Sequence, residues 1–357
     1  MKNIEEKYAN LLISENATII DALKHLNQVA GLSRMIQFVY DGNKRIIGSL
    51  TDGDVRRSLI KDKDVNKSIS LLCNRNFLFR YADEGFIDFE QYREKDIKIL
   101  PLLDRDKGLV EILDLDKIQS KLPLEAVLMA GGRGQRLRPL TDTIPKPMLP
   151  LGNKPIIEHN IDRLIKFGVK KFYISVKYLG QQIVDYFGDG SEKGVQIEYI
   201  WEDKPLGTAG ALSLIKGFNT KYIVLMNSDL FTDVNFENLY LNILREKALM
   251  TIATVPYTTK VPYGIFDLEG DKITGITEKP TYVNYANAGV YLLDTSIIKQ
   301  IPYKEFFNIT DLIQVLLDKK EPINQVPIIG NWIDIGQHQD YMRAQEIMNH
   351  LMKRNFY

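Results

Sequence analysis

The sequence is first informative for what it lacks. Cys73 is the only cysteine among 357 residues, which excludes an intrachain disulfide framework and fits a reducing compartment. The N-terminal segment has no apolar core of the signal-peptide kind, and no later run is long and apolar enough to span a bilayer. We therefore expect a cytoplasmic protein without a membrane partner.

An excess of charge of one sign is also missing. The 46 basic side chains are balanced by 46 acidic ones, so no global field favours nucleic acid, and we expect no nucleic-acid partner. The few histidines show no metal-ligand spacing, which argues against a histidine metal centre. They are His25, His159, His338 and His350.

Two familiar phosphate-binding motifs are absent, although the chain has a suitable glycine loop. Residues 126–130 form an apolar run of strand length that leads into Gly131, Gly132 and Gly134. Glycines allow the backbone to turn tightly there and to approach a ligand. The third glycine of a dinucleotide fingerprint is missing, and so is the Gly-Lys-Ser/Thr of a P-loop. The loop must therefore be of another kind.

The pattern that is present reads Gly131-Gly132-x-Gly134-x-Arg136-Leu137-x-Pro139-Leu140-Thr141, followed by Pro145-Lys146-Pro147-Met148-Leu149-Pro150. It resembles the signature of the sugar-1-phosphate nucleotidyltransferases, and its two cations and fixed prolines make the match specific. The resemblance extends from residue 125 to about residue 345. It implies that Arg136 and Lys146 stabilise the α-phosphate and the departing pyrophosphate. It also implies a backbone cradle for the nucleotide, made by Ala130, Gly131, Gly132 and Gly134.

The length of the chain exceeds that of a usual single domain, so we expect two domains, the second at 124–350. From residue 125 onward, apolar strand-like runs alternate with amphipathic segments. The runs are 125–130, 171–177, 195–201, 221–226 and 248–256, with helix candidates at 156–167 and 208–216. This alternation predicts an α/β, Rossmann-like domain with a doubly wound, mainly parallel sheet that binds ligands at the carboxyl ends of its strands. The tail, 337–353, is expected to form a closing helix.

Residues 1–118 contain an internal repeat. The segment 35–51 aligns without a gap on 98–114, with a constant offset of 63 residues. Each copy is expected to form strand, helix, strand, strand and helix, and such duplicated units are typical of repeat architectures. The arrangement resembles a tandem pair of CBS domains, with copies at about 10–62 and 65–118.

In CBS domains a threonine and an aspartate after the last strand commonly hold the ribose of an adenine nucleotide. The resemblance implies this role for Thr51 and Asp54. Thr51 can equally be the N-cap of a helix over residues 54–60, because a hydroxyl suits that position. The second copy has Asp114 and Lys117 in the corresponding places, so one nucleotide site is in doubt. The pair can instead act chiefly in dimerisation or folding.

Two aspartates stand where chemistry on a nucleoside triphosphate needs oxygen ligands for a divalent cation. Asp229 ends the apolar run that begins at Tyr222, and Asp334 lies in a short apolar segment bounded by glycines. Taken alone, each is a turn residue or a helix cap. Together with the glycine loop they resemble the two metal-binding aspartates of the nucleotidyltransferases, which implies Mg²⁺.

The segment 202–211 lies against base and ribose in that family, which implies contacts from Glu202, Gly207 and Thr208. A carboxylate at the base edge offers only acceptors, and these complement the N1–H and N2–H₂ donors of guanine. Thymine and uracil present two carbonyl groups instead, and relatives that use those bases commonly carry glutamine here. We therefore infer GTP. The alternative is an exposed Glu202 that pairs with Lys204.

Further segments resemble the family's sugar-phosphate pocket. The resemblance implies that Lys279 holds the sugar phosphate, that Glu278 accepts hydrogen bonds from sugar hydroxyls, and that Asn287 binds the hexose. Gly264 would offer its backbone N–H.

These observations predict a sugar-1-phosphate guanylyltransferase of nucleotide-sugar biosynthesis, which converts GTP and a sugar 1-phosphate to a GDP-sugar and pyrophosphate. CBS-fused relatives include enzymes that act on glucosamine 1-phosphate in legionaminic acid synthesis, so a hexosamine is the first candidate. Another nucleotide, or mannose or heptose 1-phosphate, remains open. We also expect a homo-oligomer. The rival interpretation is a non-catalytic nucleotide-sensing protein, but the retention of every expected cation and acid favours an enzyme.

Overall fold

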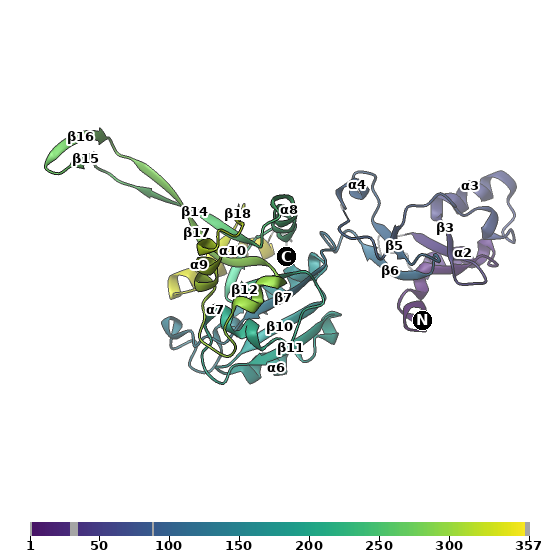
Figure 1. Ribbon diagram of the computed structural model, residues 1–357. Coiled ribbons are helices and arrows are strands. Elements are labelled where there is room, and N and C mark those ends of the chain that lie inside the picture. The colour runs from purple at the N-terminus through teal and green to yellow at the C-terminus, as the bar shows by residue number, and fades with distance from the viewer. Residues whose placement is uncertain (1, 29–34, 88, 354–357) are drawn as a thin grey trace. The chain divides into compact units, whose positions relative to one another are not determined.

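The computed structural model describes residues 2–28, 35–87 and 89–353. The chain forms two compact units, Met1–Lys121 and Leu122–Tyr357 (Figure 1). Unit 1 has its own buried cluster around Ile19, Leu50 and Val55, and unit 2 has one around Ile223 and Leu293. Each unit therefore has a core of its own.

The first half of unit 1 follows the strand and helix order expected of a CBS domain. Its elements are α1 (Lys2–Lys7), β1 (Leu12–Ser14), α2 (Ile19–Gln28), β2 (Ile36–Tyr40), β3 (Ile46–Thr51) and α3 (Asp52–Asp62). Strand β2 pairs parallel with β1 and antiparallel with β3. Helix α2 covers this sheet because its apolar side chains recur at helical spacing and are buried on one face, as at Ile19, Ala22 and Leu26.

The second half of unit 1 repeats the strands. It consists of β4 (Arg80–Tyr81), α4 (Glu90–Arg93), β5 (Ile99–Leu103) and β6 (Leu109–Asp114). Strands β5 and β6 begin and end 63 residues after β2 and β3, which confirms the repeat for these strands. The predicted last helix of this copy is wrong. Residues 115–117 form a turn instead, because the Arg93 guanidinium binds the carbonyl oxygens of Leu115, Ile118 and Gln119 and Pro123 follows shortly.

Unit 2 is built on a seven-stranded sheet with the order β11-β10-β7-β12-β17-β14-β18. The strands are β7 (Leu124–Met129), β10 (Lys171–Val176), β11 (Gln196–Trp201), β12 (Tyr222–Asn227), β14 (Met250–Lys260), β17 (Thr281–Asp294) and β18 (Ile323–Pro327). The first four are parallel, and β17 runs antiparallel to its neighbours β12 and β14. The predicted mainly parallel α/β sheet is confirmed. After β7 the chain adds β10 and β11 on one side of that strand, and it then adds β12 on the other side. The order of the strands therefore reverses between β7 and β12, and ligands are expected at the carboxyl ends of these two strands.

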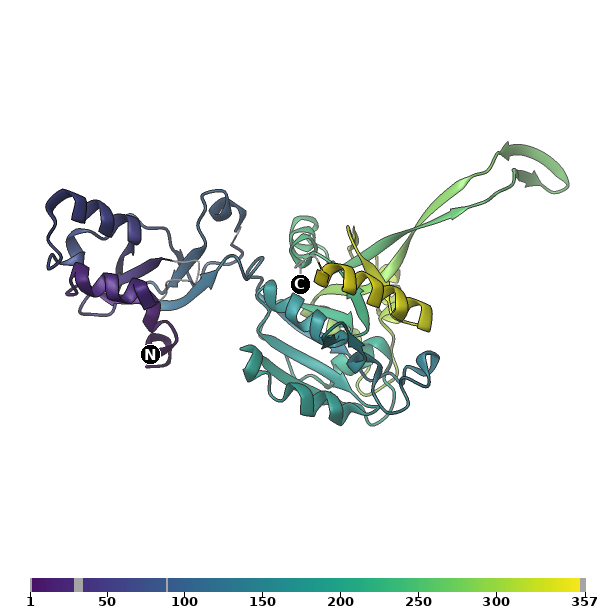
Figure 2. The ribbon, with the colours of Figure 1, turned by 180° about the vertical axis from the view of Figure 1, so that it is seen from behind.

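Helices cover both faces of this sheet. Ala126, Val127 and Leu128 of β7 are all fully buried, and successive side chains of a strand point to opposite faces. The covering helices are α5 (Ile156–Lys166), α6 (Gly180–Phe187), α8 (Phe236–Glu246), α9 (Ile309–Asp318) and α10 (His338–Lys353). Helix α10, drawn in yellow in Figure 2, closes the unit as expected.

One predicted helix, 208–216, is much shorter than expected. It is a single turn, α7 (Gly207–Gly210), followed by the 3-10 turn η6 (Ala211–Leu214). Gly210 lies against the loop that precedes α9, where an added Cβ would be 2.6 Å from the carbonyl oxygen of Glu305. The α-helix ends at Gly210, where the backbone packs closely against this loop.

A two-stranded arm leaves the sheet. Beyond Thr254, which is the last residue of β14 that pairs with β18, β14 and β17 continue as a ribbon of their own. The ribbon ends in the hairpin of β15 (Ile265–Glu269) and β16 (Lys272–Thr277). We call residues 255–286 the arm. It projects from the body of unit 2 in both views (Figures 1 and 2).

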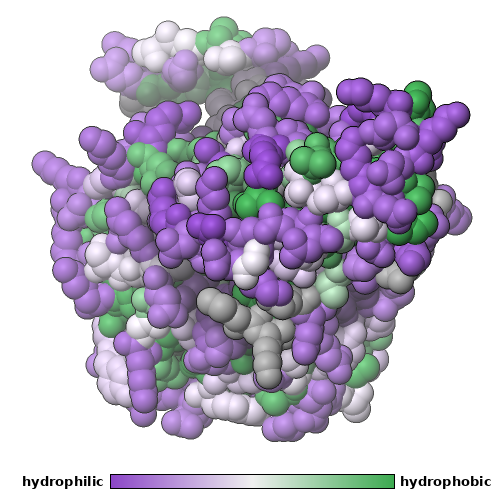
Figure 3. Space-filling view, turned by 90° about the vertical axis from the view of Figure 1, so that its right-hand side faces the viewer, coloured by the Kyte–Doolittle hydropathy of each residue, from purple (hydrophilic) through white to green (hydrophobic). Residues whose placement is uncertain are grey.

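The face drawn in Figure 3 is mainly hydrophilic, with hydrophobic side chains scattered singly or in small groups, as on an ordinary protein surface. Within the described part of the chain, no helix combines the length and the apolar character needed to cross a membrane.

Candidate active site

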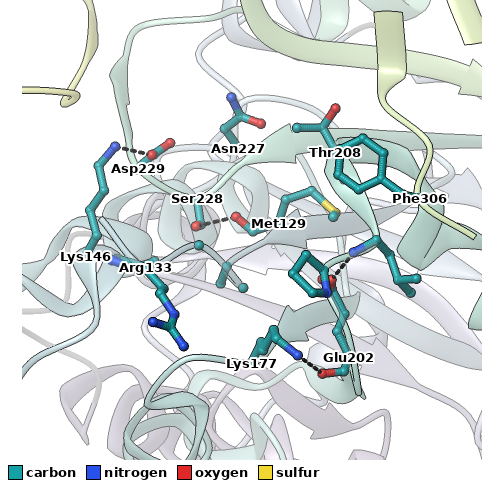
Figure 4. A pocket seen from close by; sticks show the side chains of 17 residues that line it. Met129, Arg133, Lys146, Lys177, Glu202, Thr208, Asn227, Ser228, Asp229 and Phe306 are labelled. Carbon is teal, nitrogen blue, oxygen red and sulfur yellow. Dashed lines mark hydrogen bonds and ion pairs between the residues drawn. The ribbon is translucent and has the colours of Figure 1, made fainter. Parts of the chain in front are cut away.

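A pocket of about 410 Å³ lies at the carboxyl ends of β7 and β12. The structure brings together here many of the residues expected from the sequence, namely Ala130, Gly131, Gly132, Lys146, Glu202, Gly207, Thr208 and Asp229. Figure 4 shows their arrangement around the opening. Met129, Arg133, Pro147, Lys177, Pro205, Leu206, Asn227, Ser228 and Phe306 complete the lining.

The glycine loop forms one wall of this pocket. Ala130 donates its N–H to the carbonyl oxygen of Ser175 on β10, so the loop starts from a fixed place. A Cβ on Gly131 would lie 3.0 Å from Oε1 of Glu202, so a side chain there would press on the Glu202 carboxylate. Gly134 does not line the pocket. Its φ of +61° and its approach to Lys146, where a Cβ would be 2.9 Å from the lysine Cβ, let the loop close over that lysine.

Lys146 lies between the two predicted metal-binding acids. Its ammonium group is hydrogen-bonded to Oδ2 of Asp229 and lies 3.9 Å from Oδ1 of Asp334. The acids are held by the pairing of β13 (Leu230–Thr232) with β19 (Trp332–Asp334), in which Leu230 lies opposite Asp334. The backbone ladder thus joins acids that are far apart in sequence.

The electrostatics of this cluster favour an added cation. Partial burial and the negative charge of Asp229 raise the pKa of Asp334, while Lys146 and Arg136 act in the opposite direction. Oδ1 of Asp229 is buried and accepts no hydrogen bond, which is costly for a carboxylate oxygen. The carboxylates of Asp229 and Asp334, with Oδ1 of Asp229 unpaired, fit Mg²⁺. This ion is commonly coordinated by one or two carboxylates and by substrate phosphates. Among the described residues no group of three or more His, Cys, Asp or Glu side chains could hold a metal.

Arg136 lies outside the pocket, in the 3-10 turn η3 (Gln135–Leu137). Its side chain is exposed and lies beside Gly336, where a Cβ would be 3.3 Å from its Nη2. The guanidinium therefore faces the Asp334 side of the cluster.

Glu202 is buried at the pocket wall, with 8% of its surface exposed. The Ser175 hydroxyl donates to Oε1, and the N–H of Leu206 donates to Oε2 over 2.9 Å. The alternative of an exposed Glu202 paired with Lys204 is wrong, because the carboxylate is turned inward. Each carboxylate oxygen can accept more than one hydrogen bond, so the group keeps acceptor capacity for a ligand.

Gly207 and Thr208 connect the pocket to α9. Gly207 has a φ of +77°, and a Cβ there would lie 2.7 Å from the carbonyl oxygen of Phe307. The Thr208 hydroxyl accepts from the N–H of Ile309 over 2.9 Å. Both residues are held by backbone contacts at this edge.

Sequence reasoning missed two cations of the lining. Lys177 donates to the carbonyl oxygens of Glu202 and Asp203, at 2.9 Å and 2.7 Å, and the Arg133 guanidinium lies 5.7 Å from the ring centre of Tyr178. Lys177 directly follows β10, and Arg133 lies within the glycine loop. A search for polar residues after each parallel strand would have found Lys177, because these strand ends meet at one edge of the sheet.

The predicted sugar-phosphate residues are not brought together with the pocket. Gly264, Glu278 and Lys279 lie on the arm, past the last paired residues of β14 and β17, Lys260 and Thr281. Asn287 alone lies at the base of the arm, where it pairs with Thr254. Its Oδ1 accepts from the N–H of Gly289 over 3.0 Å, and an added Cβ on Gly289 would be 2.8 Å from the amide of Asn227, a pocket residue.

In unit 1, Thr51 is the N-cap of α3. Its hydroxyl accepts from the Asp54 N–H at 3.3 Å, while the Asp54 carboxylate accepts from the Thr51 N–H at 2.9 Å. The other oxygen of Asp54 pairs with Arg57. The helix-cap interpretation is confirmed, and the ribose-binding role of Thr51 and Asp54 stays a prediction.

The strand order, the glycine loop and the lysine between two acids are features of a nucleotide-binding α/β transferase. The family model described as "Nucleotidyl transferase" matches residues 125–350, and the model described as "CBS domain" matches residues 10–61. The chain therefore belongs to the nucleotidyl transferase family and carries a CBS domain in its N-terminal unit.

Several of the similar curated proteins have names that specify a sugar phosphate. The chain is 33% identical over 242 residues to a UTP–glucose-1-phosphate uridylyltransferase of Synechocystis sp., with 62% of each chain covered. It is 30% identical over 227 residues to the "Mannose-1-phosphate guanylyltransferase catalytic subunit beta" of Danio rerio, covering 61% of this chain and 63% of the relative. The match thus spans somewhat less than two thirds of these relatives' length.

Solved structures show the same fold. A putative glucose-1-phosphate thymidylyltransferase from Bacillus anthracis, in complex with a sucrose, has a TM-score of 0.52 and 26% identity. The match covers 63% of this chain and 95% of that one. HddC from Yersinia pseudotuberculosis has a TM-score of 0.50 and 26% identity, with 63% and 99% covered.

Proposed function

We propose that the protein is a sugar-1-phosphate guanylyltransferase, which forms a GDP-sugar and pyrophosphate from GTP and a sugar 1-phosphate. The observation that carries this proposal is the cluster of Lys146, Asp229 and Asp334 beside a glycine loop. Family membership and sugar-phosphate relatives support the general reaction. A hexosamine 1-phosphate is the first candidate acceptor, and mannose or heptose 1-phosphate the next.

In this reaction an oxygen of the sugar phosphate attacks the α-phosphorus of the nucleotide, and the bond to the pyrophosphate breaks. The nucleophile is already an anion, so the protein needs no general base. Its task is to hold the two substrates in line and to neutralise charge. The backbone N–H groups of Gly131 and Gly132, together with Lys146 and Arg136, serve the nucleotide phosphates. Magnesium held by Asp229 and Asp334 supplies further neutralisation when bound.

The choice of GTP rests on Glu202. Its buried carboxylate presents acceptors to the pocket, which suits the paired donors of guanine and opposes the carbonyl groups of uracil and thymine. The presence of a uridylyltransferase among the relatives makes this a necessary test.

Glu202→Gln is expected to lower turnover with GTP relative to UTP and dTTP, because one acceptor becomes a donor. The measurement is the ratio of kcat/KM values for the three nucleotides. Ser175→Ala is the matched control, since it removes the hydroxyl that donates to Glu202 and leaves the carboxylate unchanged. An unchanged nucleotide ranking in Glu202→Gln would remove this residue from base recognition.

The reaction itself is tested by pyrophosphate release over a grid of nucleoside triphosphates and sugar 1-phosphates. We expect release with GTP and a hexosamine 1-phosphate. If no pair gives pyrophosphate while nucleotides still bind, the protein is a nucleotide sensor that has kept the fold.

A further inference from the structure

Asn160 occupies a position on helix α5 that would suit an apolar side chain. Ile156 and Leu164 of this helix are fully buried, and Asn160 lies one helical turn from each of them, so it belongs to the same face. Asn160 itself is 3% exposed. Burial of a side-chain amide is costly unless its hydrogen bonds are made. The presence of an amide here is therefore explained by the groups that it binds.

The Asn160 amide binds the backbone on both sides of Asp229. Its Nδ2 donates to the carbonyl oxygen of Ser228 over 3.3 Å and to the carbonyl oxygen of Leu230 over 2.9 Å. A side-chain amide has two N–H donors, and here both are used on the residues that flank the predicted metal ligand. Helix α5 thus holds the turn between β12 and β13.

Two further contacts hold the same turn. The N–H and the hydroxyl of Ser228 both donate to the carbonyl oxygen of Met129 at the end of β7, over 3.3 Å and 2.6 Å. Figure 4 shows the bond from the hydroxyl. The N–H of Ile335, which directly follows β19, donates to the carbonyl oxygen of Asp229 over 3.2 Å. The backbone at Asp229 is therefore held from β7, from α5 and from the segment after β19.

The fixed backbone determines where the Asp229 carboxylate points. Its Oδ2 binds the Lys146 ammonium group, and its Oδ1 is buried without a hydrogen-bond partner among the described residues. Without the Asn160 donors, the turn could relax until Oδ1 met another donor. Loss of a group that orients a metal ligand from outside the coordination shell typically weakens metal affinity by about 10- to 100-fold.

We propose that Asn160 is a positioning residue, which holds the turn at Asp229 so that Oδ1 is directed at a divalent cation. Asn160 does not line the pocket, so it acts through Asp229 and not by contact with the substrates. The hydrogen bonds to Ser228 and Leu230 are the means, because they fix the residue between them. This inference rests on the proposed function for the role of Asp229 as a magnesium ligand.

Binding of Mn²⁺ to the full chain tests this role without turnover. Mn²⁺ favours the same oxygen ligands as Mg²⁺, and the electron paramagnetic resonance signal of the free ion reports how much is bound. Asn160→Leu removes both donors with a side chain of the same branching, and Asn160→Ala removes them without added bulk. Each is expected to raise the Kd for Mn²⁺ by about 10-fold. Asp229→Asn gives the level of binding that does not use this site.

Arg163→Met is the matched control on the same helix. The Arg163 Nε donates to the carbonyl oxygen of Val234 over 2.8 Å, and its guanidinium lies 3.6 Å from the Asp233 carboxylate. These contacts lie beyond the far end of β13. Their loss is expected to lower the midpoint of thermal unfolding and to leave the Kd for Mn²⁺ unchanged. Equal weakening of Mn²⁺ binding by Arg163→Met and Asn160→Leu would assign the effect to the helix as a whole and overturn the inference.

Pyrophosphate release provides a second measurement. The Mg²⁺ concentration for half-maximal turnover is expected to rise by about 10-fold in Asn160→Ala, and saturating Mg²⁺ should restore most of kcat. A fall in kcat that added Mg²⁺ does not restore would overturn the inference. Wild-type Mn²⁺ affinity in both Asn160 variants, with circular dichroism showing that they are folded, would overturn it as well. The same holds for a wild type that binds Mn²⁺ no better than Asp229→Asn.

Failure of the proposed function would give a different result. The wild type would then release no pyrophosphate with any substrate pair, while Mn²⁺ binding would still respond to replacement of Asn160 and not to replacement of Arg163. In that case the reaction is wrong and the positioning role of Asn160 stands.

Discussion

Asp229 combines an ion pair with an unused buried oxygen, and this makes it the most informative single residue. Asp229→Asn keeps the shape but removes the charge that holds Lys146 and would hold a metal ion. We expect turnover to fall by about 100-fold or more, as when one electrostatic group is lost from a transition state. The measurement is kcat for GDP-sugar formation, with circular dichroism as the check on folding.

Asp233→Asn is the matched control for that change. Asp233 lies directly after β13, whereas Asp229 directly precedes it, and its Oδ2 accepts from the N–H and the side-chain amide of Asn331, at 2.9 Å and 2.8 Å. Its replacement is expected to affect stability more than turnover. Near wild-type turnover of Asp229→Asn would exclude the metal assignment.

His159 gives the chain a pH dependence of its own. It is 8% exposed, and its Nε2 lies 2.8 Å from the carbonyl oxygen of Leu151. Burial lowers the pKa of His159 below its usual value of 6.5, so the folded chain keeps the ring neutral where the unfolded chain takes up a proton. The stabilisation is present above the unfolded pKa and is lost as the pH falls through the folded pKa.

The test compares the free energy of unfolding of the wild type and of His159→Gln from about pH 7 to about pH 5. Glutamine can donate a hydrogen bond but does not titrate in this range. The wild type should lose more stability than the variant on acidification. Parallel curves would show that His159 contributes nothing to the acid sensitivity.

At the scale of elements, α3 depends on its cap. Thr51→Ala removes the side-chain half of the capping box and is expected to lower the stability of unit 1 by about 1 kcal/mol. Thr51→Ser keeps the hydroxyl and should retain most of it. The measurement is urea unfolding of each variant, followed by adenine-nucleotide binding. A loss of nucleotide binding in Thr51→Ala without a loss of stability would favour the ligand role.

Elements with a strong local signal were predictable from the sequence. The apolar runs 171–177 and 195–201 became β10 and β11 within a residue at each end. Strand β10 is buried and nearly continuous in apolar residues, whereas β11 is an edge strand with only Ile197 buried. The run 248–256 gave only the inner part of β14, since the outer part, residues 257–260, is exposed and carries no apolar run. The length of β14 is set by its ladder with β17, and that pairing is not local.

Some features of the candidate site were likewise predictable from the sequence, and others were not. The glycine loop, Lys146 and Asp229 were predictable because strand ends and motif spacing place them at one edge of the sheet. The burial of Glu202 was not predictable, because it depends on Ser175 of a neighbouring strand and on the N–H of Leu206. The distance of Lys279 from the pocket depends on the path of the arm, which residue spacing does not specify.

At the scale of the whole molecule, the two units should unfold separately. Their buried clusters are distinct, and compact units with separate cores behave as separate cooperative transitions. Calorimetry should therefore resolve two components. Leu50→Ala and Leu128→Ala, both at fully buried positions, should each destabilise by about 2–5 kcal/mol and shift a different component. A single transition moved by both variants would contradict this.

The pairing of β13 with β19 determines when, during synthesis of the chain, the cluster of Lys146, Asp229 and Asp334 can form. A growing chain leaves the ribosome from its N-terminus, and domains form as their parts emerge. The glycine loop, Lys146 and Asp229 emerge early, while Asp334 arrives on β19, just ahead of α10, which packs Ala344 and Met348 onto the same buried cluster as Ile333. The cluster is thus assembled only after β19 has been synthesised, and a product that stops before β19 has its lysine and first acid but cannot complete the cluster.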